Sequence, residues 1–434
     1  MAEGLRSQLW PLPALGVVLA VAAGVGLPEL DRVIRYRVPL RVTALLFGGG
    51  AEAARAVLQT IAGSLITVTA LTFSLTVVAL QMASSQYSPR LLRTFSADRY
   101  VQVTLALLLT TFTYALTVLR TVRTGDAGEF VPQLSVSVAF ALALASVVLL
   151  VVFLSHLVRE LRAEVMLIAV HQDAERAIER VLGDNEPEEG DRPAEPLRQP
   201  GEAVPLLASR SGFLTAVDEA AMLRAAVDAD AVVLVDRLPG SSLVAGTPCG
   251  SAWPRESATF RPGARDELLR RAARAIVAGH ERTDAQDIAF ALRQFSDVAI
   301  KALSPGLNDP TTAVHALSHS SALLCELARR RLGPRTLYDD ERRLRVVLNR
   351  PDLSNLLDVA VTQPLRYGAA EPEVLARLLM LLHEVAWVVR PACPSGLATC
   401  LRRLRTTVAE QSFPAEERAR LEALVRQAEQ SIRA

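Results

Sequence analysis

Four hydrophobic stretches without a single Asp, Glu, Lys or Arg lie in the first 158 residues, at 9–28, 56–89, 101–119 and 131–158. An α-helix needs about 20 consecutive, mainly apolar residues to cross a hydrocarbon layer about 30 Å thick, and each stretch reaches or approaches that length. The sequence therefore predicts a mainly α-helical membrane protein. Residues 1–158 are expected to form a bundle of four transmembrane helices, with spans at about 9–28, 57–86, 101–119 and 133–157.

The second stretch carries most of its polar residues on one face of the predicted helix. At about 100° per residue, the small or polar side chains of this polar row share one face. They are Gln59, Gly63, Thr67, Ser74, Gln81, Ser85 and Ser88. A smaller row of Thr69, Thr72 and Thr76 lies opposite. Small and hydroxyl-bearing residues let helices approach closely and hydrogen-bond, so one interpretation is a helix packed in a bundle. The alternative is that the polar row lines a water-filled path.

The middle of these stretches contains no carboxylate and no histidine. Such groups inside a membrane are the usual marks of proton relays and ion-coupled transporters. A proton pump is therefore not expected.

The rest of the chain has the composition of a soluble region. The formal net charge of +1 gives no sign of nucleic-acid binding. The four cysteines all lie in this region without CxxC spacing, which favours reduced cytoplasmic thiols over a disulfide framework. Residues 159–202 predict a helical stalk and a Pro/Glu-rich linker, and residues 203–262 predict a small β-rich module with one helix capped by Asp218. Residues 263–434 predict a helical cytoplasmic domain.

Orientation is less constrained than the number of spans. If the C-terminal region is cytoplasmic, the loop at 84–100 lies inside and the loop at 29–55 lies outside. The outer loop carries five arginines, which fits the positive-inside rule poorly. The first stretch has small residues suited to signal-peptide cleavage, but its apolar run is longer than a typical signal core and predicts a retained anchor. We expect a multi-pass protein of the bacterial cytoplasmic membrane.

A helix–turn–helix segment is the most distinctive part of the soluble region. Thr283 and Gln286 have the spacing of a capping box, and Pro305 predicts that the helix they open ends near Leu303. Asp309 is the predicted N-cap of the next helix. The turn and the charged i, i+4 row before it are candidates for a site of cytoplasmic assembly. These residues are Arg293, Asp297, Lys301, Ser304, Pro305, Gly306, Asn308, Asp309 and Pro310.

Two segments carry a family resemblance: ITVTALTFSLTVVALQMASSQYSPRLLRTF, from the second stretch, and RTDAQDIAFALRQFSDVAIKALSPGLNDPTTAV, around the turn. Together they resemble a bacterial membrane-protein family known as domain of unknown function 2254. The resemblance covers nearly the whole chain and implies an integral membrane protein with several N-terminal spans. It implies no established activity, so it supplies no catalytic residues.

The soluble region shows no motif that carries an enzymatic reaction. His315 and His319 have metal-ligand spacing, but no Cys or third ligand lies near them in the sequence, so we expect ordinary surface or interface histidines and no metal. Walker, GxGxxG, GxSxG and kinase signatures are absent from the sequence. We expect neither an enzyme nor a cofactor.

Two functional hypotheses follow from these patterns. The leading one is a homo-oligomeric, channel-like or solute-conducting protein whose path is lined by the polar row. The alternative is a non-conducting membrane scaffold or sensor with a cytoplasmic interaction domain, in which the polar row joins helices. The expected partners are the lipid bilayer and further copies of the chain, without nucleic acid. The sequence identifies no ion or small-molecule ligand.

Overall fold

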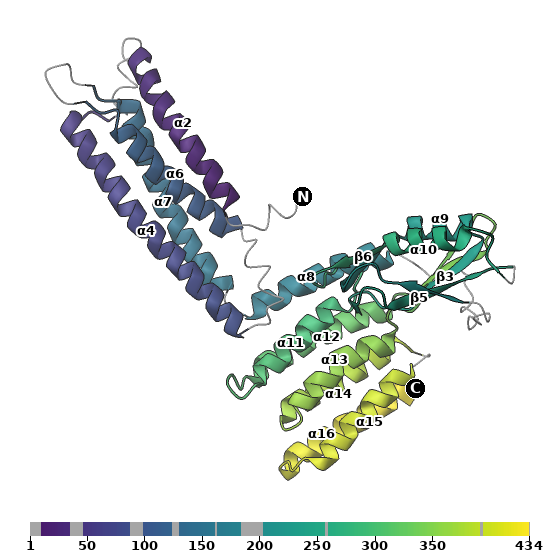
Figure 1. Cartoon of the computed structure of the whole chain (residues 1–434). Coiled ribbons are helices and arrows are strands. Elements are labelled where there is room, and N and C mark those ends of the chain that lie inside the picture. Colours follow the sequence, from purple (N-terminus) through teal and green to yellow (C-terminus); the bar gives the residue numbers. More distant parts are fainter. Residues whose placement is uncertain are drawn as a thin grey trace. The chain divides into compact units, whose positions relative to one another are not determined.

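The computed structural model describes residues 10–34, 47–86, 99–123, 130–160, 163–183, 203–256, 259–390 and 394–433 (Figure 1). The chain divides into two compact units, Met1–Val165 and Met166–Ala434. Both units are rich in helix, which confirms the predicted fold class of a mainly α protein with four apolar N-terminal helices.

The first unit contains the four expected spans. They are α2 (Pro11–Ile34), α4 (Ala51–Gln86), α6 (Arg99–Leu119) and α7 (Gln133–Glu160). Each is long and apolar enough to cross a membrane. Helix α6 contacts the other three and is the most buried of them, so it forms the centre of the bundle.

Helices α2 and α6 pack closely through small residues. A Cβ atom on Gly16 would lie 2.3 Å from the hydroxyl oxygen of Thr110, and one on Gly24 would lie 2.7 Å from Cβ of Thr117. Glycine at such positions lets two helix backbones approach within the membrane. The two glycines therefore fix how near α2 lies to α6.

A carboxylate at the end of α2 caps the start of α7. Asp31 accepts hydrogen bonds from the backbone N–H groups of Leu134 and Ser135, both at 3.0 Å, and from the Ser135 hydroxyl at 2.7 Å. The first N–H groups of a helix lack partners within the helix, and negative charge is stabilised at this end of the helix dipole. Asp31 therefore ties α2 to α7 at one end of the bundle.

The second unit contains two small sheets. Their strands are β1 (Val204–Leu207), β2 (Gly212–Val217), β3 (Ala231–Val235), β4 (Ser242–Leu243), β5 (Pro248–Pro254), β6 (Ile276–Gly279), β7 (Arg335–Tyr338) and β8 (Leu344–Leu348). One sheet has the order β1-β5-β3-β8-β7, in which only β3 and β8 are parallel, and the other has the antiparallel order β4-β2-β6. Helices α9 (Glu219–Asp228) and α10 (Ala264–Ala275) pack against the larger sheet around a shared apolar core.

Part of this layout was predicted and part was not. The Asp218 carboxylate accepts the Ala221 N–H at 2.9 Å and caps α9, which confirms the predicted capped helix. The region from residue 263 onward, for which helices were predicted, also contributes the strands β6, β7 and β8. Strand β8 pairs with β3 from far upstream, so its place in the sheet depends on a partner that local sequence does not reveal.

The helices beyond the sheets form two layers (Figure 1). Helices α11, α13 and α15 contact one another in succession, and α12, α14 and α16 do the same. Their bounds are α11 (Phe290–Ala302), α12 (Pro310–Ala328), α13 (Leu353–Tyr367), α14 (Pro372–Val388), α15 (Ser395–Glu410) and α16 (Ala415–Arg433). The second unit begins within α8 (Ala163–Leu182), the helix predicted at the start of the stalk. At the C-terminal end of α8, Arg350 donates a hydrogen bond to the Val181 carbonyl and Arg330 donates one to the Gly183 carbonyl.

Candidate functional site

The described part of the polar row lies on the surface of the membrane unit. Its exposed members are Gln59, Gly63, Thr67, Ser74 and Gln81. The backbone of Ser85 belongs to α4, but its side chain lies outside the described residues, as does the whole of Ser88. The structure therefore places the row on one continuous, outward-facing strip of α4.

The opposite face of α4 packs into the bundle. Leu58, Leu65, Thr69 and Thr72 are buried there, so the smaller threonine row is the one that lies inside the unit. The Thr69 hydroxyl donates to the Leu65 carbonyl at 2.7 Å, so this buried hydroxyl is paired within its own helix. The polar row thus does not pack against the other described helices of the same chain.

Hydroxyls on the outward side are partly paired within α4. The Thr67 hydroxyl donates to the Gly63 carbonyl at 3.2 Å. The side chains of Gln59, Ser74 and Gln81 make no hydrogen bond to any residue that the structure describes. These three polar groups would need water, headgroups or another protein chain as partners in a membrane.

The turn between α11 and α12 has the predicted form. Helix α11 ends at Ala302, and Asp309 caps α12, in which Pro310 is the first residue. The Asp309 carboxylate accepts the Thr312 N–H at 3.0 Å and the Thr312 hydroxyl at 2.6 Å. These two bonds confirm Asp309 as the N-cap. They also hold the pKa of the Asp309 carboxyl below its usual range.

Backbone bonds make this turn compact. The N–H of Asp309 donates to the Ala302 carbonyl at 2.9 Å, and the Ser304 hydroxyl donates to the Lys301 carbonyl at 2.7 Å. Asn308 has a φ of +48°, a left-handed conformation that asparagine tolerates better than most residues.

The rest of the predicted assembly site is accessible. Pro305, Gly306 and Asn308 are exposed, whereas Arg293, Asp297 and Lys301 are half-buried along α11. Their role in assembly stays a prediction.

The predicted capping box at Thr283 and Gln286 is wrong. Helix α11 begins only at Phe290, without a side-chain cap. The Gln286 amide instead accepts the Val217 N–H at 2.8 Å and donates to the Val217 carbonyl at 3.1 Å. Gln286 therefore imitates a neighbouring strand along β2, and this tertiary contact prevails over the local capping pattern.

A buried ion pair follows in the same segment. Asp287 is 3% exposed, and its carboxylate lies 2.6 Å from the guanidinium of Arg282. Burial raises the pKa of Asp287, and the nearby Arg282 opposes this effect. A Cβ on Gly240, which has a φ of +78°, would overlap both side chains, so the turn before β4 has room only for glycine.

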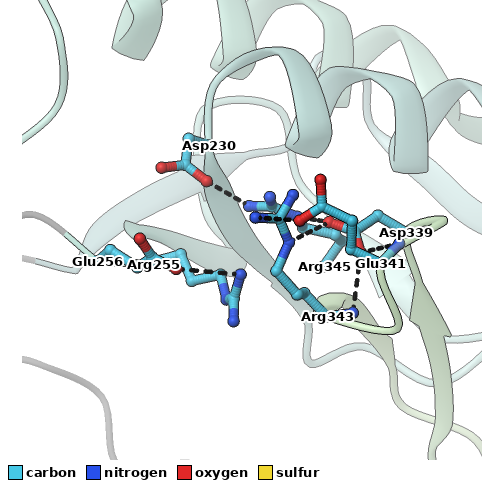
Figure 2. Close-up of polar contacts among 7 residues, drawn as sticks. All are labelled: Asp230, Arg255, Glu256, Asp339, Glu341, Arg343 and Arg345. Carbon is cyan, nitrogen blue, oxygen red and sulfur yellow. Dashed lines mark hydrogen bonds and ion pairs between the residues drawn. The ribbon is translucent and has the colours of Figure 1, made fainter.

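A second buried network lies at one end of the larger sheet (Figure 2). Arg345, on β8, is 2% exposed; its Nη1 lies 2.7 Å from Asp230 and its Nε lies 2.8 Å from Asp339. Asp230 directly precedes β3, and Asp339 directly follows β7. Arg343 adds a third contact, 2.9 Å from Asp339. The network therefore joins the ends of three neighbouring strands.

Each carboxylate of this network faces a guanidinium, and Arg343 also pairs with Glu341 at 2.6 Å (Figure 2). Burial raises the pKa of Asp339, but the Arg343 N–H and the guanidiniums of Arg345 and Arg343 outweigh it and hold that pKa below its usual range. Arg255 and Glu256 form a separate pair nearby (Figure 2). Sequence reasoning missed the network, although β-branched and aromatic residues on both sides of the Asp-Asp-Glu turn are a hairpin signal.

An aromatic cluster joins α8 to α11 and α12. The ring of His171 lies 5.2 Å from that of His319, which stacks on Phe295 at 5.6 Å. Burial, then the nearby His171 and His315, lower the pKa of His319. Among the described residues, no three His, Cys, Asp or Glu side chains meet in an arrangement that could hold a metal. The cluster is therefore a packing contact, in which burial favours the neutral form of the His319 ring.

Comparison with known proteins identifies relatives over most of the chain. The family described as "Predicted membrane protein (DUF2254)" matches residues 6–384. Uncharacterised proteins of Mycobacterium bovis and of Mycobacterium tuberculosis strain H37Rv are each 37% identical over 384 residues, which cover 88% of this chain and 72% of each relative. No solved structure matches the chain.

Proposed function

Because the chain belongs to the DUF2254 family of predicted membrane proteins, we propose that it forms a homo-oligomer in which the α4 helices meet around a path for an ion or small solute. The observation that carries this proposal is the outward position of the polar row. The four-helix bundle buries the opposite face of α4 and leaves the row available to a neighbouring subunit.

Lipid alone is a poor neighbour for this face. Side-chain amide and hydroxyl groups without hydrogen-bond partners are costly in hydrocarbon, and those of Gln59, Ser74 and Gln81 have none among the described residues. A second copy of the chain offers the same strip of small and polar residues. Contact between two such strips, or water held between them, would supply the missing partners.

The positions along α4 fit a path with polar mouths. Gln59 and Gln81 are about 22 positions apart, which is about 33 Å along a helix axis and close to the thickness of the hydrocarbon layer. The two amides would then lie near its two surfaces, with Gly63, Thr67 and Ser74 between them. This spacing places small or hydroxyl-bearing residues between the two amides.

One observation favours the second candidate, a non-conducting scaffold or sensor. The Thr67 hydroxyl is already paired with the Gly63 carbonyl, and no atom lies within 4 Å of a Cβ built on Gly63. A strip in which the Thr67 hydroxyl is satisfied beside an open glycine is suited to tight helix–helix contact. In that case the polar rows would join subunits and leave no water between them.

The proposal places the second unit in the cytoplasm of a bacterium, with the bilayer and further copies of the chain as partners. We assign it no catalytic reaction, no cofactor and no nucleic-acid ligand. Two thiols of the second unit, Cys249 and Cys400, are free and buried. This is compatible with a reducing compartment. A reporter that is active only in the cytoplasm, fused after Ala434, should be active; a silent cytoplasmic reporter beside an active periplasmic one would refute this orientation.

Cysteine scanning of α4 distinguishes the candidates. Ser74→Cys would be compared with Phe73→Cys, which lies at nearly the same depth, is 55% exposed and points about 100° away from the polar row. Both variants would be tested in native membranes for disulfide cross-linking and for labelling by a small, water-soluble thiol reagent. Peptide-level mass spectrometry separates these sites from the four natural cysteines.

The path predicts that Ser74→Cys both cross-links between subunits and labels faster than Phe73→Cys. Cross-linking without faster labelling supports the scaffold instead. If Ser74→Cys neither cross-links nor labels faster than the control, the polar row faces lipid and both candidates are wrong.

A further inference from the structure

A basic groove lies between α13 and α15, on the second unit. Its volume is about 730 Å³, within the range of about 300–1,000 Å³ that is typical of small-molecule sites. Its lining contains three arginines (Arg366, Arg402 and Arg403), one acidic residue (Asp358), four threonines and the apolar Leu365.

Only one of the three arginines is neutralised by the acidic residue. Arg403 lies 2.9 Å from the Asp358 carboxylate and also donates to the Thr362 hydroxyl at 3.1 Å. Within the described part of the chain, neither Arg366 nor Arg402 contacts a carboxylate; Arg402 reaches only the Thr399 hydroxyl, at 3.4 Å. Two guanidiniums in the groove therefore carry uncompensated positive charge.

The surroundings add neutral donors and an apolar base. Thr406 is exposed in the groove and makes no hydrogen bond to another described residue, so its hydroxyl is available to a ligand. Leu365, a buried apolar side chain, lies beneath the polar rim. A groove with two unpaired guanidiniums, a hydroxyl and an apolar base fits an anion that also has a larger body.

We propose that this groove binds the phosphate group of a phosphorylated small molecule. A guanidinium is planar and donates two parallel hydrogen bonds to the oxygens of one phosphate, and two guanidiniums balance the charge of a dianion. A single carboxylate would leave one of the two charges unbalanced. The phosphate belongs either to a soluble metabolite or to the headgroup of an anionic phospholipid. The groove lies outside the membrane unit, so this proposal does not depend on a path along α4.

The test uses the purified full-length protein in an uncharged detergent. Inorganic pyrophosphate would be titrated by calorimetry at constant ionic strength. We expect saturable binding that becomes about tenfold weaker or more in the double variant Arg366→Gln, Arg402→Gln, because charge-assisted hydrogen bonds are lost. The matched control is Arg420→Gln, Arg426→Gln, which removes the same charge from exposed positions on α16. The control should bind as the wild type does.

A second arm distinguishes the two sources of phosphate. Short-chain phosphatidylglycerol and phosphatidylcholine, each below its micelle concentration, would be titrated into the wild type, the groove variant and the α16 control. Binding of phosphatidylglycerol more tightly than pyrophosphate identifies a lipid headgroup, and the reverse order identifies a soluble phosphate. Either result supports the groove when the double variant Arg366→Gln, Arg402→Gln weakens that binding about tenfold or more.

The proposal is overturned if neither pyrophosphate nor phosphatidylglycerol binds. It is also overturned if the groove variant binds as the wild type does, or if the α16 control loses as much affinity. All substituted positions are exposed, so the melting temperatures of the ligand-free variants should equal that of the wild type. Equal melting temperatures show that a loss of affinity in the groove variant does not come from unfolding.

Discussion

Replacement of Arg345 by methionine would measure what the buried network at the end of the larger sheet contributes to stability. Arg345 is the only member that contacts both Asp230 and Asp339 through bonds of 2.7 and 2.8 Å (Figure 2). Methionine has a similar length and no charge, so Arg345→Met removes both bonds without leaving a large cavity. The change therefore isolates the electrostatic part of the contact.

The expected loss can be worked out from the remaining partners. A hydrogen bond to a charged group contributes about 1.5–3 kcal/mol. Asp339 keeps Arg343 and the N–H of Glu341, and Asp230 is partly exposed, so water can replace its lost partner. The guanidinium also no longer has to be desolvated, which offsets part of the loss. We expect Arg345→Met to lower the free energy of local opening by about 2 kcal/mol, or about 30-fold in the opening equilibrium.

Hydrogen–deuterium exchange of the full-length protein in detergent reports this opening at peptide resolution. Amides of β8 and β3 should exchange about 30-fold faster in Arg345→Met, whereas those of α14 should be unchanged. Arg343→Met is the matched control, because Arg343 is more exposed and contacts Asp339 but not Asp230. If β8 exchanges at the wild-type rate in Arg345→Met, desolvation cancels the two bonds and the reasoning is wrong.

Three further variants test contacts in other parts of the chain. Asp309→Ala should lower the free energy of unfolding by about 1 kcal/mol through loss of the Thr312 cap, measured by urea denaturation; no change would show that the cap is dispensable. Asp31→Ala should cost about 1–3 kcal/mol through loss of its bonds to the start of α7, seen as a lower melting temperature in detergent, and an unchanged melting temperature would contradict this. Burial lowers the pKa of His319 from 6.5, so as pH falls the unfolded chain binds a proton at this residue before the folded chain does. The free energy of unfolding should therefore decrease as pH drops below about 6.5. His319→Gln should reduce this pH dependence, and an unchanged slope would exclude His319 as its source.

Short-range patterns predicted the elements whose causes lie within a few residues. The four apolar stretches predicted the four membrane helices, because the length of an uncharged run is enough to identify a span. Asp218 and Asp309 predicted two helix starts, since an N-cap bonds to an N–H only three residues further along. Such features need no knowledge of the rest of the fold.

Long-range pairing set the limits of prediction. Val233 on β3 pairs with Val346 on β8, and the sequence of neither strand indicates that the two strands pair. A long-range contact also explains why the predicted capping box does not form. The Gln286 side chain hydrogen-bonds to the backbone of Val217 and does not cap a helix. The buried Arg345 escaped notice for the same reason, since a charged residue becomes part of a core only when distant carboxylates meet it.

Helix α4 combines both situations, and this gives the proposed assembly its basis. The projection at about 100° per residue showed that the polar row shares one face of the helix and the threonine row lies opposite. It did not show which of the two faces packs against α6. The structure buries Thr69 and Thr72, whose hydroxyls bond to their own helix at no cost in partners. The Gln59 and Gln81 side chains lie on the outer face, where they make no hydrogen bond to another described residue. A face that the bundle does not cover and hydrocarbon does not favour is the expected location of a contact between subunits.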